Sequence, residues 1–107
     1  MPFFEIRQYF IKPGKMASWL KMFDEEIVPF QTGKGMVIHG VFSGEDDDSL
    51  FMWIRRFEDE THREKLYAAV YDDDVWKNEF ADRIGDHIDR SKIKVSRVVP
   101  SAMSVMK

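Results

Sequence analysis

The chain has 107 residues, enough to bury one hydrophobic core, and we expect residues 1–107 to form a single domain. Hydrophobic residues make up 44% of the chain and charged residues 33%, as in a soluble globular protein rather than a disordered one. The net charge of −3 gives no basic excess for binding nucleic acid, and the absence of cysteine excludes thiol catalysis, disulfides and thiolate metal sites.

Two observations bear on localisation. No apolar run approaches the ~18 residues that a membrane-spanning helix requires, so we expect no membrane partner. A predicted strand begins within three residues of Met1, which leaves no room for a signal or transit peptide. We therefore expect a cytoplasmic protein.

Hydrophobic periodicity predicts seven elements in the order strand, helix, strand, strand, helix, short helix, strand. They occupy residues 3–10, 16–30, 36–42, 51–57, about 58–71, 76–88 and 93–99. Pro29 is expected to kink the first helix or to end it early. This order matches an α+β, ferredoxin-like β-α-β-β-α-β sandwich, with four antiparallel strands and two main helices on one face. The other face would be exposed, so we expect an isologous homodimer with two sheets face to face.

Two predicted strands carry large or charged side chains on both faces. Residues two apart share a face, so Glu5, Arg7 and Tyr9 point one way on the first strand, and Trp53 and Arg55 share a face on the third. A solvated face would show small polar residues instead, so we expect this face to be covered. It is then a subunit interface, a ligand pocket or both, and we assign it to the interior of the dimer.

Short motifs follow one another in a fixed order: an E-x-R-x-Y strand with a P-G-K turn, a G-x-F strand, a W-x-R-x-F strand, a helical Arg, and a Trp after an acidic break. Their residues are Glu5, Arg7, Tyr9, Pro13, Gly14, Gly40, Phe42, Trp53, Arg55, Phe57, Arg63 and Trp76. This arrangement resembles the NIPSNAP family of the dimeric α+β barrel superfamily, from residue 3 to about 80 and again in the last strand. Arg56, where bacterial relatives often have Gly, and Asp72–Asp74, in place of a Gly-rich break, depart from the pattern.

The candidate ligand-binding residues are the five side chains of the charged face together with one histidine. They are Glu5, Arg7, Tyr9, His39, Trp53 and Arg55. Two interpretations of the five strand residues stay open. They bind a small polar or aromatic ligand, or they form ion pairs and packing contacts that hold two sheets together. The resemblance implies that His39 could contact a ligand, since the wider superfamily uses pocket histidines; the alternative is a half-buried histidine bonded to a neighbour.

Metal and cofactor motifs are missing from the chain. Its three histidines show no metal-ligand spacing. The acidic runs Asp46–Asp48 and Asp72–Asp74 lack the pattern of a calcium loop and are explained as solvated turns and helix caps. We predict no metal and no cofactor.

Three functions remain. The first is a small homodimeric barrel of unassigned role that binds a small aromatic or acidic molecule in a sheet-lined pocket. The resemblance suggests as the second a cofactor-independent enzyme (monooxygenase, isomerase or lyase), with Glu5, Tyr9 or His39 as acid or base. The third is a purely structural or interaction dimer, in which the charged strand face only fixes the register of the subunits. If Glu5 neutralises only one of Arg7 and Arg55, the other should prefer a carboxylated aromatic ligand to its neutral amide. That preference should be lost in Arg7→Met or Arg55→Met. We also expect Trp53→Ala to impair dimerisation or ligand uptake more than Trp76→Ala, which should lower the stability of the monomer.

Overall fold

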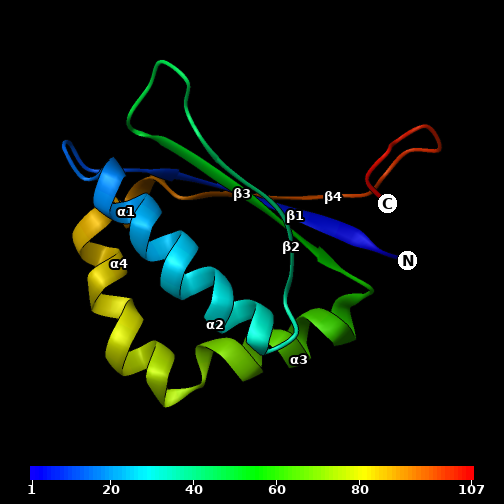
Figure 1. Cartoon of the computed structure of the whole chain (residues 1–107). Helices are drawn as coiled ribbons and strands as arrows, with labels where there is room; N and C mark the ends of the chain where they lie inside the picture. The colour runs from blue at the N-terminus through cyan, green and yellow to red at the C-terminus, as the bar shows by residue number, and fades with distance from the viewer.

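The computed structural model of residues 1–107 has two layers, a sheet and a set of helices packed on one of its faces (Figure 1). The sheet is antiparallel throughout, with the strands in the order β2, β3, β1, β4. Their bounds are β1 Phe3–Phe10, β2 Val37–Ser43, β3 Leu50–Phe57 and β4 Lys94–Val98. This confirms the predicted α+β, ferredoxin-like order.

The helical layer contains two long runs and α3. The first run consists of α1 (Met16–Met22), a π-helical turn η1 (Phe23–Ile27) and α2 (Val28–Gly33). After α3 (Glu60–Tyr71), the second run consists of the π-helical turn η2 (Trp76–Phe80) and α4 (Ala81–His87), and a 3₁₀ turn, η3 (Arg90–Lys92), leads into β4. None of these helices has the length and the apolar composition that a membrane-spanning segment requires.

Of the two predicted effects of Pro29, an early end of the first helix does not occur, because the helix continues to Gly33. Pro29 stands in the first turn of α2, where a missing N–H is tolerated. The π-helical turn comes just before it, with the Val28 N–H donating to the carbonyl of Phe23. The hydroxyl of Thr32 donates to the Val28 carbonyl at 2.8 Å. The wider turn therefore carries the chain past the proline without a break.

The charged face of the sheet lies under the helices of the same chain. Glu5 pairs with Arg55 across β1 and β3, and Arg7 pairs with Trp53. Glu5, Trp53 and Arg55 are only 3%, 2% and 0% exposed. The prediction that this face is covered is confirmed, but its assignment to a dimer interior is wrong. The helices of one chain already bury it, so Trp53 is a core residue of the protomer.

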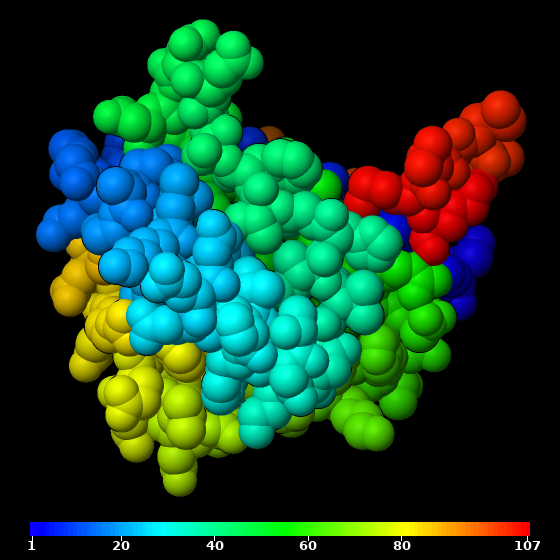
Figure 2. Space-filling view, in the orientation of Figure 1, coloured from blue at the N-terminus to red at the C-terminus, as the bar shows by residue number.

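The opposite sheet face has no helix over it. Side chains that point this way come from the alternate positions of the strands, and the exposed apolar ones include Val37, Phe42, Leu50 and Val98. The loop between β2 and β3 rises at one end of this face, and the C-terminal tail rises at the other (Figures 1 and 2). The tail is tied to the sheet by Arg56 Nε, which donates to the carbonyl of Lys107 at 2.7 Å.

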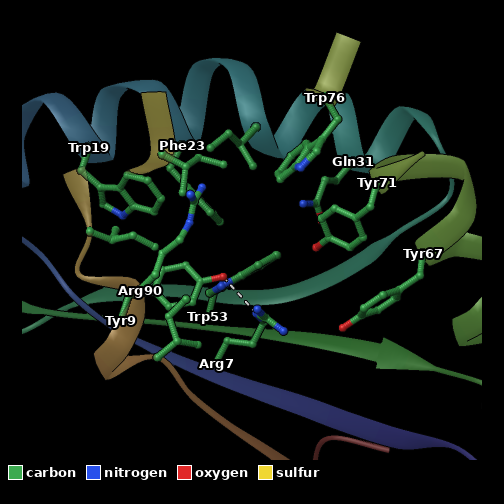
Figure 3. Close-up of a pocket in the computed structure, with 14 residues that line it drawn as sticks. Arg7, Tyr9, Trp19, Phe23, Gln31, Trp53, Tyr67, Tyr71, Trp76 and Arg90 are labelled. Carbon is green, nitrogen blue, oxygen red and sulfur yellow. Dashed lines mark hydrogen bonds between the residues drawn. The ribbon is translucent and has the colours of Figure 1, made fainter. Parts of the chain in front are cut away.

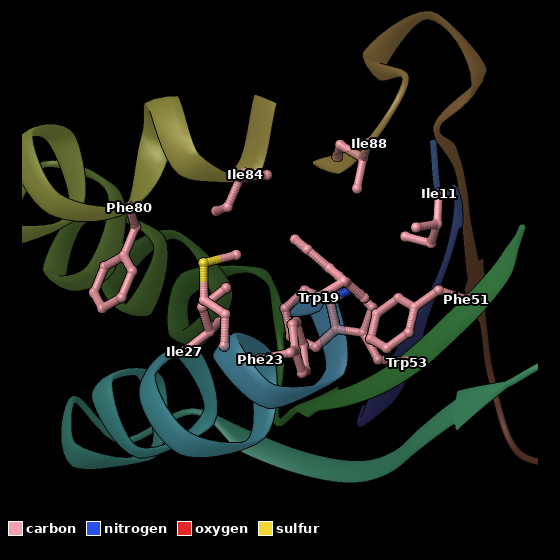
Figure 4. Close-up of a cluster of buried hydrophobic side chains, with 10 residues drawn as sticks. Ile11, Trp19, Phe23, Ile27, Phe51, Trp53, Phe80, Ile84 and Ile88 are labelled. Atoms are coloured by element: carbon pink, nitrogen blue, oxygen red, sulfur yellow. The ribbon is translucent and has the colours of Figure 1, made fainter. Parts of the chain in front are cut away.

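Two apolar clusters make up the core. The larger joins the first helical run, the second run and the middle of the sheet, and contains Ile11, Trp19, Met22, Phe23, Ile27, Phe51, Trp53, Phe80, Ile84 and Ile88 (Figure 4). The smaller joins α3 to the ends of β1 and β3 and contains Phe3, Met36, Phe57, Leu66 and Val70. Arg55 stands between them on β3, flanked by Trp53 of one cluster and Phe57 of the other.

Candidate functional site

A pocket with a volume of about 200 Å³ lies between the sheet and the helices (Figure 3). Its walls are largely aromatic and aliphatic side chains, which is typical of small-molecule sites. The lining residues are Arg7, Tyr9, Trp19, Phe23, Ile27, Gln31, Trp53, Tyr67, Tyr71, Trp76, Ile84, Ile88, Arg90 and Ile93.

A buried polar network borders one side of the pocket, with Arg55 at its centre. Arg55 Nη2 donates to Glu5 Oε1 at 2.6 Å and to the Tyr67 hydroxyl at 2.9 Å. Arg55 Nη1 donates to Gln31 Oε1 at 3.0 Å and to the Tyr71 hydroxyl at 2.8 Å. The Tyr67 hydroxyl in turn donates to Glu5 Oε2 at 2.6 Å. Both oxygens of Glu5 are thereby used inside the protein.

The network fixes the protonation of its members. Burial alone would raise the pKa of the Glu5 carboxyl, but the charge of Arg55 and the hydrogen bond from Tyr67 outweigh burial and lower this pKa. Burial raises the pKa of Tyr67 to about 12, against the opposing charge of Arg55 and with support from its bond to Glu5. At neutral pH, Glu5 is therefore a carboxylate and Tyr67 a neutral phenol.

Arg7 is the cation of this group with the weakest anionic partner. Its Nη1 is 3.4 Å from Glu5 Oε1, a longer contact than the 2.6 Å of Arg55, and its Nε donates to the Tyr9 hydroxyl at 2.9 Å. Although burial opposes it, the pKa of Arg7 is raised by Tyr9, so the guanidinium keeps its charge. The side chain remains 18% exposed and lines the pocket.

A second arginine, Arg90, reaches the pocket from the 3₁₀ turn before β4. Its Nη2 donates to the carbonyl of Ala81 at 2.7 Å, and its guanidinium passes close to Gly85, where a Cβ would approach Nη1 to 3.1 Å. Two arginines and no carboxylate are therefore among the residues that line the pocket. Because Glu5 is engaged by Arg55, the pocket carries a net positive charge.

Three buried side chains that line the pocket have N–H groups without a hydrogen-bond partner. They are Trp19 Nε1, Gln31 Nε2 and Trp53 Nε1. Buried donors in native proteins are almost always paired, so each unpaired one calls for an explanation. An acceptor-bearing molecule in the pocket would provide their partners.

The structure brings five of the six predicted site residues together. Arg7, Tyr9 and Trp53 line the pocket, and Glu5 and Arg55 form the ion pair beside it. The sixth, His39, does not join them. It is exposed on the opposite sheet face, where its ring contacts that of Phe4 at a centroid distance of 5.2 Å.

The other two histidines also lie outside the pocket walls. His62 Nδ1 accepts the N–H of Glu58 at 3.0 Å at the start of α3. His87 Nε2 is 3.0 Å from Ser18 Oγ, which ties α4 to α1. No group of three or more acidic or histidine side chains is arranged to hold a metal ion.

Sequence reasoning missed the helical side of the pocket, although two signals were present. Gln31 follows Phe23 and Ile27 at four-residue spacing, so it is a polar residue on an apolar helical stripe. Tyr67 and Tyr71 are also four residues apart and present two hydroxyls on one face of α3. Either pattern predicts a polar partner on the sheet beneath, which is Arg55.

The fold and the site geometry can be compared with known proteins. A model of the NIPSNAP family matches residues 4–102. The chain belongs to the NIPSNAP family. The curated proteins include no match to it. The NIPSNAP assignment confirms the resemblance of the E-x-R-x-Y and W-x-R-x-F strands, and the family's function is uncharacterised.

Solved NIPSNAP structures share the whole fold. A NIPSNAP family protein from Agrobacterium tumefaciens strain C58 is 20% identical with a TM-score of 0.89, covering 100% of both chains. A second protein from that strain, described as a NIPSNAP family protein with unknown function, is 24% identical with a TM-score of 0.88, covering 99% of this chain and 94% of the other. An uncharacterised NIPSNAP domain protein from Burkholderia xenovorans is 21% identical with a TM-score of 0.83, covering 95% of this chain and 97% of the other.

Proposed function

We propose that this protein binds a small aromatic acid in the pocket between its sheet and its helices. The observation that carries the proposal is the charge of the pocket, which contains Arg7 and Arg90 and no carboxylate. Aromatic walls suit a planar ring, through stacking and edge contacts, and a guanidinium suits a carboxylate. Of the two arginines singled out in the sequence, Arg7 is the one available to a ligand, because Arg55 is fully buried with Glu5.

The size of the pocket supports a ligand of about one ring. A volume of about 200 Å³ equals roughly seven water molecules at about 30 Å³ each. Sites for drug-sized molecules run from about 300 to 1,000 Å³. A benzoate-sized molecule therefore suits the pocket better than a dinucleotide or another large cofactor.

The test compares an acid with its amide. We expect benzoate to bind more tightly than benzamide by about 10- to 100-fold, since a hydrogen bond to a charged group contributes about 1.5–3 kcal/mol. Isothermal titration calorimetry on the wild type, Arg7→Met and Arg83→Met measures both affinities. Arg83 is an exposed arginine paired with Glu26 outside the pocket and serves as the matched control.

The preference for the acid should fall about tenfold or more in Arg7→Met, where Arg90 is the one remaining arginine of the pocket, and persist unchanged in Arg83→Met. Equal affinity of the wild type for benzoate and benzamide would contradict the proposal and leave Arg7 as a structural cation. Arg55→Met, which the sequence suggested as an equivalent test, is unsuitable because it leaves Glu5 buried beside an empty site.

We also infer that a second copy of the chain covers the open sheet face. Apolar side chains on this face remain exposed, among them Phe42 at 50% and Val37 at 42%. The projecting β2–β3 loop and C-terminal tail border a hollow that could receive a facing sheet (Figure 2). Since the pocket lies on the other side of the sheet, the proposed dimer and the proposed ligand occupy separate surfaces.

A further inference from the structure

We propose that the aromatic acid carries a second oxygen, a carbonyl, held by the side chains of Gln31 and Tyr71. This inference rests on the proposed function and specifies its ligand. The two side chains line the pocket together and share one neighbour, Arg55 Nη1, which donates to both. We call this pair the Gln31–Tyr71 subsite.

The first argument is the orientation of the Gln31 amide. Its oxygen accepts from Arg55 Nη1, which turns the NH₂ group away from the arginine. Gln31 is 0% exposed, yet this NH₂ group has no hydrogen-bond partner. A buried donor without a partner destabilises the folded protein, so an unpaired amide at the pocket wall is best explained by an absent acceptor.

The second argument is the Tyr71 hydroxyl. Its oxygen accepts from Arg55 Nη1 at 2.8 Å, and its own hydrogen is left to donate. The subsite therefore offers the NH₂ group of Gln31 and the O–H of Tyr71 as donors (Figure 3). The charge of Arg55, which donates to both side chains, lies beside them. A carbonyl oxygen has two lone pairs and can accept both hydrogen bonds.

The third argument is the position of the subsite relative to Arg7. Gln31 comes from α2 and Tyr71 from α3, whereas Arg7 comes from β1 (Figure 3). The ligand would thus contact the sheet through its carboxylate and the helical layer through its carbonyl. An aromatic acid with a single polar group would leave either Arg7 or the donors of Gln31 and Tyr71 without a hydrogen-bond partner.

The experiment compares two ligands of nearly equal shape. In 4-acetylbenzoate the substituent carries a carbonyl, and in 4-isopropylbenzoate a methyl group replaces that oxygen. The 3-substituted pair is measured as well, so that the result does not depend on the position of the substituent relative to the carboxylate. The quantity of interest is the ratio of the isopropyl to the acetyl dissociation constant, obtained by calorimetry for each pair.

Gln31→Glu is the principal variant, because glutamate keeps an oxygen to accept from Arg55 and replaces the NH₂ donor with a second oxygen. The negative charge that it adds weakens the binding of both acids alike and therefore does not alter their ratio. Tyr71→Phe is the second variant and removes only the hydroxyl. We expect the ratio to fall by about tenfold or more in Gln31→Glu, equivalent to about 1.4 kcal/mol, and to fall in Tyr71→Phe. The preference for benzoate over benzamide should persist in Tyr71→Phe, because Arg7 is unchanged.

The outcomes separate the two proposals. If the wild type binds neither acid, the proposed function itself is wrong. If both acids bind and the ratio is the same in the wild type and in both variants, the carbonyl subsite is excluded while the aromatic-acid site stands. Thermal melting of each variant checks its fold, and Tyr71→Phe decides the question if Gln31→Glu does not fold.

Discussion

Arg55 carries a full positive charge in the protein interior, and its neighbours explain how the fold accommodates it. Its guanidinium carbon lies 4.4 Å from the ring centroid of Trp53 and 5.0 Å from that of Tyr67. Glu5 supplies the compensating charge at 2.6 Å. A buried cation needs both a counter-ion and hydrogen-bond acceptors, and the aromatic faces add cation–π attraction.

Removal of Arg55 should therefore be far more damaging than removal of Arg7. We expect Arg55→Met to lower the free energy of unfolding by about 3–5 kcal/mol, because Glu5 is left as an uncompensated buried charge. Arg7→Met should lower it by about 1 kcal/mol, the value of one hydrogen bond. Urea denaturation followed by circular dichroism measures both, and equal losses would show that Glu5 depends on both arginines.

The lowered pKa of Glu5 predicts a pH dependence of stability. A carboxyl whose pKa is lower in the folded protein than its ordinary value of 4.5 stabilises the fold fully above about pH 4.5. That contribution is lost as the pH falls through the lower, folded-state pKa. The wild type should therefore lose more stability below about pH 4.5 than Glu5→Gln does, as measured by urea midpoints at several pH values.

The control for this measurement is Glu25→Gln. Glu25 is an exposed glutamate of the π-helical turn η1 and has no ion pair. The urea midpoints of Glu25→Gln should fall below about pH 4.5 by as much as those of the wild type do. If the wild type and Glu5→Gln lose the same stability as the pH falls, the ion pair with Arg55 does not hold Glu5 in its charged form.

Among the elements, the helical runs next to the pocket each contain a π-helical turn. Phe23 and Ile27 belong to the first and Trp76 begins the second, and all three line the pocket. Such turns insert an extra residue into a helix, redirect the side chains around it and occur often at functional sites. The hydrophobic spacing in the sequence predicted both helices, but it cannot distinguish a π-helical turn from a regular one.

The connection from α2 to β2 fixes the backbone of Gln31. The Gln31 carbonyl accepts the N–H groups of Lys34 and Met36, each at 3.0 Å. This tight turn needs Gly35 at φ +105°, a conformation that other residues rarely adopt. Gly33, two residues earlier, ends α2 with open space at its Cβ position.

Alanine at these two glycines should have opposite effects. We expect Gly35→Ala to destabilise the protein by about 1 kcal/mol or more, because of its positive φ and a Cβ contact of 3.1 Å with Leu66. Gly33→Ala should stabilise it by about 0.4–1 kcal/mol by restricting the unfolded chain. Thermal unfolding under one set of conditions measures the change in stability of each variant relative to the wild type. A change in the same direction for both variants would contradict this account.

At the scale of the whole molecule, the sequence predicted the order of the elements but not the face that the helices cover. One set of alternate strand positions holds Glu5, Arg7 and Trp53, and the other holds Phe4 and Ile6, so large side chains occur on both. Alternation alone cannot decide between two such faces. The ion pair of Glu5 with Arg55 makes burial under the helices possible, and that pairing depends on contacts between residues 50 positions apart.

The open sheet face leads to a prediction about assembly. We expect the wild type to sediment as a dimer at micromolar concentration, and Phe42→Asp to shift it to the monomer by placing a charge in the apolar interface. Val75→Asp is the matched control, since Val75 is 46% exposed but lies in the helical layer. A monomeric wild type, or equal dissociation of both variants, would exclude the sheet-face dimer.

All three tryptophans of the chain, Trp19, Trp53 and Trp76, line the same pocket. They come from three different elements, so the indoles surround the pocket from both layers (Figure 3). The intrinsic fluorescence of this protein therefore originates entirely at the proposed site. Entry of a molecule there would change the polarity around every emitter at once, so the protein carries its own optical reporter of occupancy and needs no added dye.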